Sequence, residues 1–174
     1  MKISSSLLSL SLAFLPFLLP AEETASPMAP AAFAGTVAQV DLLEIQLGEV
    51  TQTNTTTPEV KNFGAYMLKS HSEINKMLGE VAARQGLVLP STLNADGQAT
   101  LEKLSALKGR VFDTTYIPAM VAGHTEVLAM LKNYAATSTD PALKAFAEKI
   151  TPIIAVHLEH AKAAEADLKK AGAF

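Results

Sequence analysis

Four polar residues interrupt the apolar stripes of this chain, and their side chains are of types that bind metal ions. They are Glu44, His71, His124 and His157, and each lies three or four residues from apolar neighbours. That spacing places a residue on the apolar face of a helix. Three neutral imidazoles and one carboxylate suit zinc, copper, iron or manganese. The sequence therefore indicates a candidate site for a divalent transition metal or a small ligand.

A metal-free interpretation of the same residues stays open. A buried carboxylate is costly unless it is paired or coordinated. In this alternative a protonated histidine balances the charge of Glu44, and the cluster only fixes the register of the helices. His160 follows His157 by one helical turn. It could join or replace His157 in the cluster, or it could face solvent near Lys162.

The elements that must position these residues are helices, because apolar residues recur at spacings of three and four from residue 33 onward. The expected helices cover residues 33–53, 58–85, 98–108, 110–136 and 141–171. No segment alternates with the period of a strand. Four long helices joined by short or moderate links predict an all-α antiparallel four-helix bundle, with a short extra helix between the second and third long helices.

Capping residues mark the ends of these helices. Thr57 and Asp140 each precede a proline, the typical order of a cap followed by the first helical residue. Asp96 is expected to cap the short helix, and Gly86 to end the second helix.

Two prolines lie inside predicted helices. Pro118 and Pro152 should each produce a kink, unless the helix after Gly109 begins beyond Pro118.

The four candidate residues should lie near one level of the bundle. His71 lies 13 residues after Pro58, and Glu44 lies 14 residues before it. His124 and His157 each lie 16 residues from the link that joins their helices, at residues 140 and 141. Because a helix rises about 1.5 Å per residue, an error of two residues moves a side chain by only about 3 Å.

Asp113 and Tyr116 form a second polar group, for which we expect a structural role. Asp113 lies eleven residues before His124, which is about 16 Å along a helix, so the two cannot share a metal. We expect Asp113 to cap the helix that follows Gly109, and Tyr116 to form a hydrogen bond across the end of the bundle.

The N-terminus has the pattern of a secretory signal peptide. Lys2 precedes an apolar run over residues 7–19, and Ala21 is a small residue at the expected cleavage site. A run of about 13 residues is shorter than the ~20 that a transmembrane helix needs, although an uncleaved anchor is the alternative. We expect a signal peptide over residues 1–21, a flexible lead-in over 22–32 and the bundle domain over 33–174.

The signal peptide predicts an exported protein of the periplasm or cell envelope, with no integral membrane span after the signal is removed. The net charge of −3 argues against a nucleic-acid partner. The chain contains no cysteine, which excludes disulfides, thiolate metal sites and thiol catalysis. The sequence identifies no protein partner.

The order of several residues resembles one bacterial family. The matching residues are Glu44, Gly48, Phe63, Met67, His71, Gly86, Leu89-Pro90, Phe112-Asp113, Tyr116, Met120, His124, Pro152 and His157-Leu158. Over about residues 34–168 they resemble the exported family called domain of unknown function 4142. The resemblance implies a ferritin-like fold and export, and it implies no reaction. Ser70 departs from the aspartate that typically precedes the first histidine, which would weaken its orientation.

The histidines lack the partners that ferritin-like di-iron enzymes require. Those enzymes carry Glu-x-x-His on two helices, whereas Leu68, Val121 and Ile154 stand three residues before the histidines here. No phosphate-binding loop or nucleophile signature is present, so the residues do not favour an enzyme. Two hypotheses follow. The bundle binds a transition metal or small ligand in an envelope stress or storage role, or it is a non-catalytic structural or interaction module.

Overall fold

The computed structural model describes residues 28–173, and all of its regular structure in that range is helical. The five helices are α1 (Pro30–Asn54), α2 (Pro58–Gln85), α3 (Ala95–Ser105), α4 (Gly109–Thr137) and α5 (Pro141–Lys170). The all-α prediction is confirmed, and every helix end lies within three residues of its predicted position. The predicted signal peptide and residues 22–27 of the lead-in lie outside the described range. Within it, no helix has the length and apolarity needed to cross a membrane.

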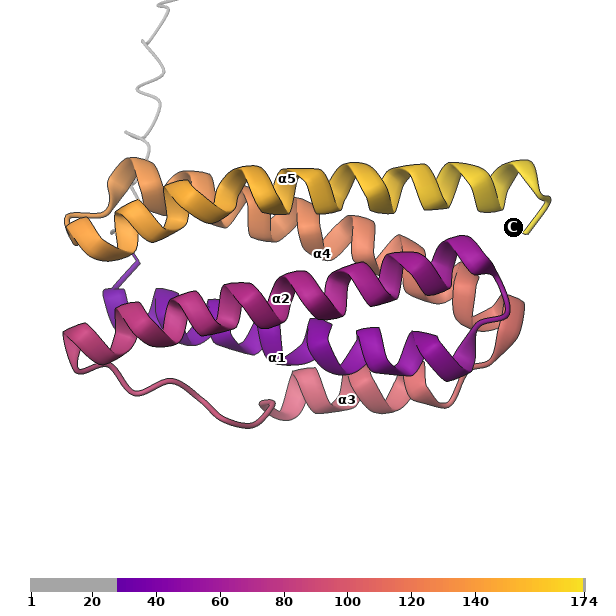
Figure 1. Cartoon of the computed structure of the whole chain (residues 1–174), viewed down its shortest axis with the longest axis horizontal. Coiled ribbons are helices and arrows are strands. Elements are labelled where there is room, and N and C mark those ends of the chain that lie inside the picture. The colour runs from indigo at the N-terminus through magenta and orange to yellow at the C-terminus, as the bar shows by residue number, and fades with distance from the viewer. Residues whose placement is uncertain (1–27, 174) are drawn as a thin grey trace, which may run out of the picture.

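The helices form two hairpins that pack into a bundle (Figure 1). In the first hairpin α1 and α2 pack along their lengths, and in the second α4 packs against α5. Helix α2 also contacts α5, which joins the hairpins, and the short α3 lies along α1 on the outside of the bundle. The predicted extra helix between the second and third long helices is therefore confirmed.

The apolar core is divided into two clusters. One contains Phe33, Ile74, Leu131 and Phe146, and the other contains residues such as Leu47, Phe63, Phe112 and Leu168. On each long helix the candidate site residue lies, in the sequence, between the residues of the two clusters. A polar layer thus separates two apolar layers, as the matching distances from the helix ends predicted.

Two of the predicted helix ends are confirmed. The Asp140 carboxylate accepts a hydrogen bond from the Leu143 N–H at 2.8 Å, and the Gln85 side chain also donates to it. Gly86 ends α2 with a φ of 65°, a left-handed conformation that glycine adopts without steric cost.

Two other predicted caps are wrong. Asn94, rather than Asp96, caps α3, because its side-chain oxygen accepts from the Gly97 N–H at 2.8 Å while Asp96 lies inside the first turn. Thr57 occupies the N-cap position of α2, but its side chain makes no capping bond. Its hydroxyl donates instead to the Asp113 carboxylate at 2.5 Å, which links this helix start to α4.

Both internal prolines lie within continuous helices. Helix α4 runs from Gly109 through Pro118, and α5 runs through Pro152. The alternative that the helix begins beyond Pro118 is therefore wrong.

Glycines permit the close approach of α1 and α2. A Cβ atom added to Gly64 would overlap the side chain of Thr51, and one added to Gly48 would lie 2.7 Å from the Gly64 carbonyl oxygen. The two helix backbones therefore meet at a distance that only glycine allows.

We expect Gly64→Ala to lower the free energy of unfolding by about 1–3 kcal/mol, since the overlap with Thr51 must push α1 and α2 apart. Gly79→Ala is the matched control on the same helix. A Cβ there meets no atom within 4 Å, so the better helix former should raise stability by about 0.5–1 kcal/mol. Urea denaturation measures both changes, and equal stability of the two variants would contradict the close packing.

The Asp140 cap should make stability depend on pH. The hydrogen bond from the Leu143 N–H, and then those from Gln85, lower the pKa of Asp140 below its ordinary value of 3.8. A lowered pKa stabilises the fold above pH 4, and this contribution is lost as the pH falls through the lowered value. Asp140→Ala should cost about 1 kcal/mol at pH 7, and less below about pH 4. Chemical denaturation at pH 7 and pH 3 tests this, with Asp140→Asn as a variant that keeps a capping oxygen. A cost that did not shrink with pH would count against the charged cap.

Candidate metal centre

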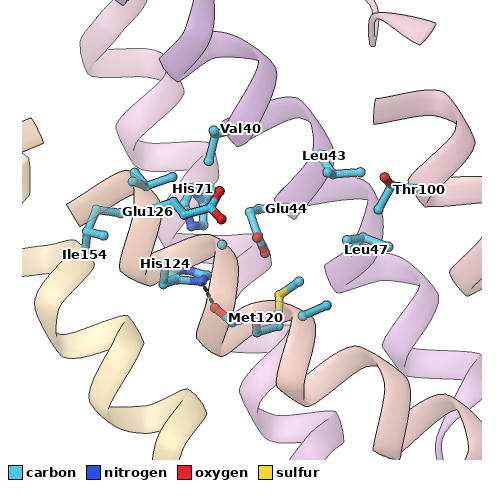
Figure 2. A pocket seen from close by; sticks show the side chains of 13 residues that line it. Val40, Leu43, Glu44, Leu47, His71, Thr100, Met120, His124, Glu126 and Ile154 are labelled. Carbon is cyan, nitrogen blue, oxygen red and sulfur yellow. Dashed lines mark hydrogen bonds between the residues drawn. The ribbon is translucent and has the colours of Figure 1, made fainter. Parts of the chain in front are cut away.

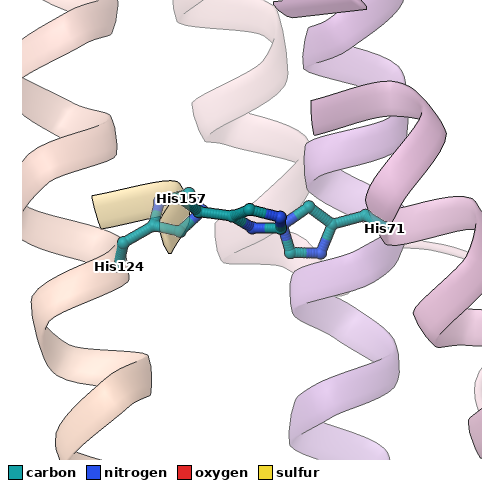
Figure 3. A group of neighbouring side chains, drawn as sticks. All are labelled: His71, His124 and His157. Carbon is teal, nitrogen blue, oxygen red and sulfur yellow. The ribbon is translucent and has the colours of Figure 1, made fainter. Parts of the chain in front are cut away.

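Three histidines from three helices meet in the middle of the bundle (Figure 3). His71 comes from α2, His124 from α4 and His157 from α5. One ring nitrogen of each lies within 4.8 Å of those of the other two, and the ring centroids are 5.0–5.7 Å apart. All three side chains are buried. The structure therefore brings together three of the four predicted ligands.

Each ring uses one nitrogen for a hydrogen bond and leaves the other without a protein partner. The Nδ1 atoms of His71 and His124 bond the Asp41 carboxylate and the Met120 carbonyl oxygen, both at 2.8 Å. The Nε2 atom of His157 lies 2.8 Å from the Ser70 hydroxyl. The remaining nitrogens, Nε2 of His71 and His124 and Nδ1 of His157, are buried with no hydrogen-bond partner. Metal-binding histidines typically show this arrangement, since the bonded nitrogen orients the ring and the free one holds the ion.

The partner of His124 determines which of its nitrogens carries the proton. A carbonyl oxygen only accepts hydrogen bonds, so the Nδ1–H of His124 must donate to Met120. In the neutral ring, Nε2 then carries the free lone pair. Burial lowers the pKa of His124, although the charge of Glu44 opposes the shift. Burial first, and then the positive charges of the other histidines, lowers the pKa of His157 to about 3. Both shifts of pKa favour the neutral rings at pH 7.

Asp41 belongs to the centre and was not among the predicted site residues. It comes from α1, is almost fully buried, and holds His71 through the 2.8 Å bond. Burial raises the pKa of Asp41 to about 6, against the lowering effect of His71. A signal was present in the sequence, because Asp41 lies four residues after Val37 and three before Glu44 on the same apolar face.

Ser70 has a role that its departure from the family pattern did not suggest. It precedes His71 but bonds His157, which lies on another helix. Asp41, rather than the residue at position 70, orients His71. The expected weakening of the support for His71 is therefore not seen in this structure.

Glu44 lies near His71 and His124 but outside the close group of three histidines. Its side chain is buried, and its Oε2 atom has no hydrogen-bond partner. It lines a cavity together with His71 and His124 (Figure 2). The predicted four-residue set is thus assembled as three clustered histidines with a carboxylate close by.

His160 does not join the cluster. It is exposed, and its ring lies 5.2 Å from that of Tyr66 between the ring centroids. Of the two alternatives for His160, the structure supports the one in which it faces solvent.

Asp113 and Tyr116 differ from their predicted roles. Asp113 lies inside α4 rather than at its N-cap, and it is buried where the Thr57 hydroxyl reaches it. Tyr116 is also buried, and its hydroxyl has no hydrogen-bond partner among the described residues. Its ring stacks on Phe112 with 5.1 Å between centroids. Burial, and then the charge of Glu44, raises the pKa of Tyr116 well above its ordinary value.

Fold and site together define an all-helical bundle protein with a buried group of three histidines. The chain matches the family described as domain of unknown function (DUF4142) over residues 18–164, and it belongs to that family. This confirms the resemblance seen in the sequence. No curated protein and no solved structure matches the chain.

We expect nitrogen NMR of the isotope-labelled, metal-free protein at pH 7 to show His124 as the Nδ1–H tautomer. The Met120 carbonyl requires this proton, whereas exposed His160 provides a reference free to exchange between tautomers. Detection of the Nε2–H tautomer at His124 would contradict the hydrogen bond and remove its free lone pair.

Proposed function

We propose that this protein binds one divalent transition metal through His71, His124 and His157, with Glu44 supplying either a fourth ligand or nearby negative charge. One observation carries the proposal. Three buried rings each direct one nitrogen to an outer hydrogen bond and leave the second nitrogen unpartnered within a compact group. Zinc, copper, iron and manganese all accept imidazole nitrogen as a ligand.

The outward hydrogen bonds favour this proposal over a cluster that only sets helix register. A buried nitrogen without a hydrogen bond costs about 1–3 kcal/mol. In a metal-free polar core, neighbouring imidazoles lower this cost by donating to one another. Here the rings of His71, His124 and His157 make their hydrogen bonds to Asp41, Met120 and Ser70 instead. A metal ion would bond the free nitrogens of all three rings at once, with each ring carrying its proton on the nitrogen that makes the hydrogen bond.

The charges around the histidines also suit a cation. Asp41 and Glu44 both lie on α1 and are both buried beside the cluster. Two carboxylates would balance a doubly charged ion held by neutral imidazoles, whereas a buried charge without balance is strongly unfavourable. Through its bond to His71, Asp41 would act as an orienting residue behind the ligand.

The cellular setting is part of the same proposal. We place the bundle in the ferritin-like class, with its two hairpins antiparallel, and the mature protein in the periplasm or cell envelope, where it stores a metal or limits its release under stress. The two packed hairpins and the signal-like N-terminus support this setting. A non-catalytic structural or interaction module in the envelope is the alternative.

Metal content tests the proposal. Protein purified from its native host without a histidine tag should contain near-stoichiometric transition metal, or should take it up when zinc, copper, iron or manganese is added. The variant with His71, His124 and His157 all changed to alanine should hold none. Elemental analysis measures both. His160→Ala is the matched control and should bind like the wild type, since His160 is exposed and outside the group.

A milder variant separates loss of metal from loss of fold. Asp41→Asn keeps the side-chain volume and an oxygen that accepts from His71, and it should weaken metal affinity about 10–100-fold while the helix content is retained. Absence of metal in the purified protein with no uptake on addition would overturn the proposal. Equal metal content in the triple variant would also overturn it. Either result would leave the cluster as a device that sets helix register.

A further inference from the structure

We propose that the cavity lined by His71 and His124 admits a small, neutral molecule to the bound metal. The molecule would carry one lone-pair donor for the metal and one N–H or O–H group for Glu44. This inference rests on the metal site proposed above and adds a ligand to it.

The cavity has a volume of about 270 Å³ and lies between α1 and α4, with Thr100 of α3 at its edge (Figure 2). His71, His124 and Glu44 form its buried polar part, and two exposed polar residues, Thr100 and Glu126, also line it. Most of the remaining wall is apolar and includes Val40, Leu43, Leu47, Met120, Val127 and Ile154. An apolar cavity of roughly 150 Å³ can hold a benzene ring, so this space is large enough for a small ring.

Small residues on α4 create this space. Ala119 and Gly123 lie four residues apart and both line the cavity, on one face of the helix. A Cβ atom added to Gly123 would meet no atom within 4 Å. The cavity is also lined by Thr100 and Glu126, which are both exposed, so it opens to solvent on their side. A ligand therefore has a path from solvent to the histidines.

The polar groups of the cavity determine which ligand it suits. The Oε2 atom of Glu44 and the Nε2 atoms of His71 and His124 are buried and unpartnered, and all three residues line the cavity. With the histidine nitrogens bonded to a metal, the Glu44 oxygen remains as an acceptor that needs a donor. The negative charge of Glu44 disfavours anions, and the apolar wall disfavours molecules with polar groups beyond those that the metal and Glu44 would bind. A neutral azole combines the required features, since one nitrogen binds metal while the other carries a proton.

Imidazole is the probe for this proposal, and cobalt(II) is the reporter metal, because its visible absorption responds to a change of ligand. Imidazole should change the spectrum of the cobalt-loaded protein in a saturable way, and azide should bind more weakly. Gly123→Leu places a side chain at the cavity wall and should weaken imidazole binding by about tenfold or more, a larger loss than any change in its cobalt affinity. Gly79→Leu is the matched control, since a Cβ at Gly79 also meets no atom within 4 Å but Gly79 is not in the cavity.

The outcomes distinguish this inference from the metal site itself. A protein that takes up no cobalt or other transition metal overturns the metal site and the ligand together. A protein that binds cobalt, but whose spectrum does not respond to imidazole, overturns the ligand alone. Equal imidazole affinity in the Gly123→Leu and Gly79→Leu variants would show that imidazole does not occupy the cavity. Tighter binding of azide than of imidazole would show that the cavity does not select a neutral ligand.

Discussion

The burial of a polar layer in the middle of an apolar bundle is the constraint on which this structure depends. Asp41, Glu44 and three histidines lie between two apolar clusters, and their side chains are almost fully removed from the protein surface. Each group therefore needs a partner from the protein or from a ligand. The partners that the chain provides satisfy only one side of each imidazole ring. The other nitrogen of each ring has no partner, although the three rings lie close together.

Much of this arrangement could be predicted from the sequence, because the height of a residue in the bundle follows from its number of residues from the helix end. Helix length is proportional to residue number, so distances from the helix ends placed His71, His124 and His157 at one level. The apolar spacing around each histidine indicated that it faced inward, and the structure buries all three. Asp41 could have been predicted in the same way, because it also interrupts an apolar stripe. The sequence around Asp41 does not indicate its partner, because His71 lies on another helix.

The wrong predictions concern side chains that can form a hydrogen bond either with a residue nearby in the sequence or with one on another helix. Thr57 stands where a hydroxyl usually caps its own helix, yet it bonds Asp113 from another hairpin. Asp113 was expected to cap a helix and instead accepts that bond inside one. Asn94 and Asp96 are both good capping residues two positions apart, and Asn94 is also held to α1, because its backbone N–H donates to the Gln39 side chain. Sequence spacing predicts local geometry, whereas tertiary contacts determine which hydrogen-bond partner each of these side chains has.

The residues of the site come from all four long helices, and this distribution couples the site to the fold. Both carboxylates come from α1, whereas the imidazoles come from α2, α4 and α5. The first hairpin contributes the Asp41–His71 pair, and the second contributes His124 and His157. Neither hairpin contains all three members of the group, so the group exists only when the hairpins are docked. A ligand that binds this group and not the unfolded chain stabilises the docked state through mass action. The packing of α2 against α5 and the binding of a metal would therefore reinforce each other.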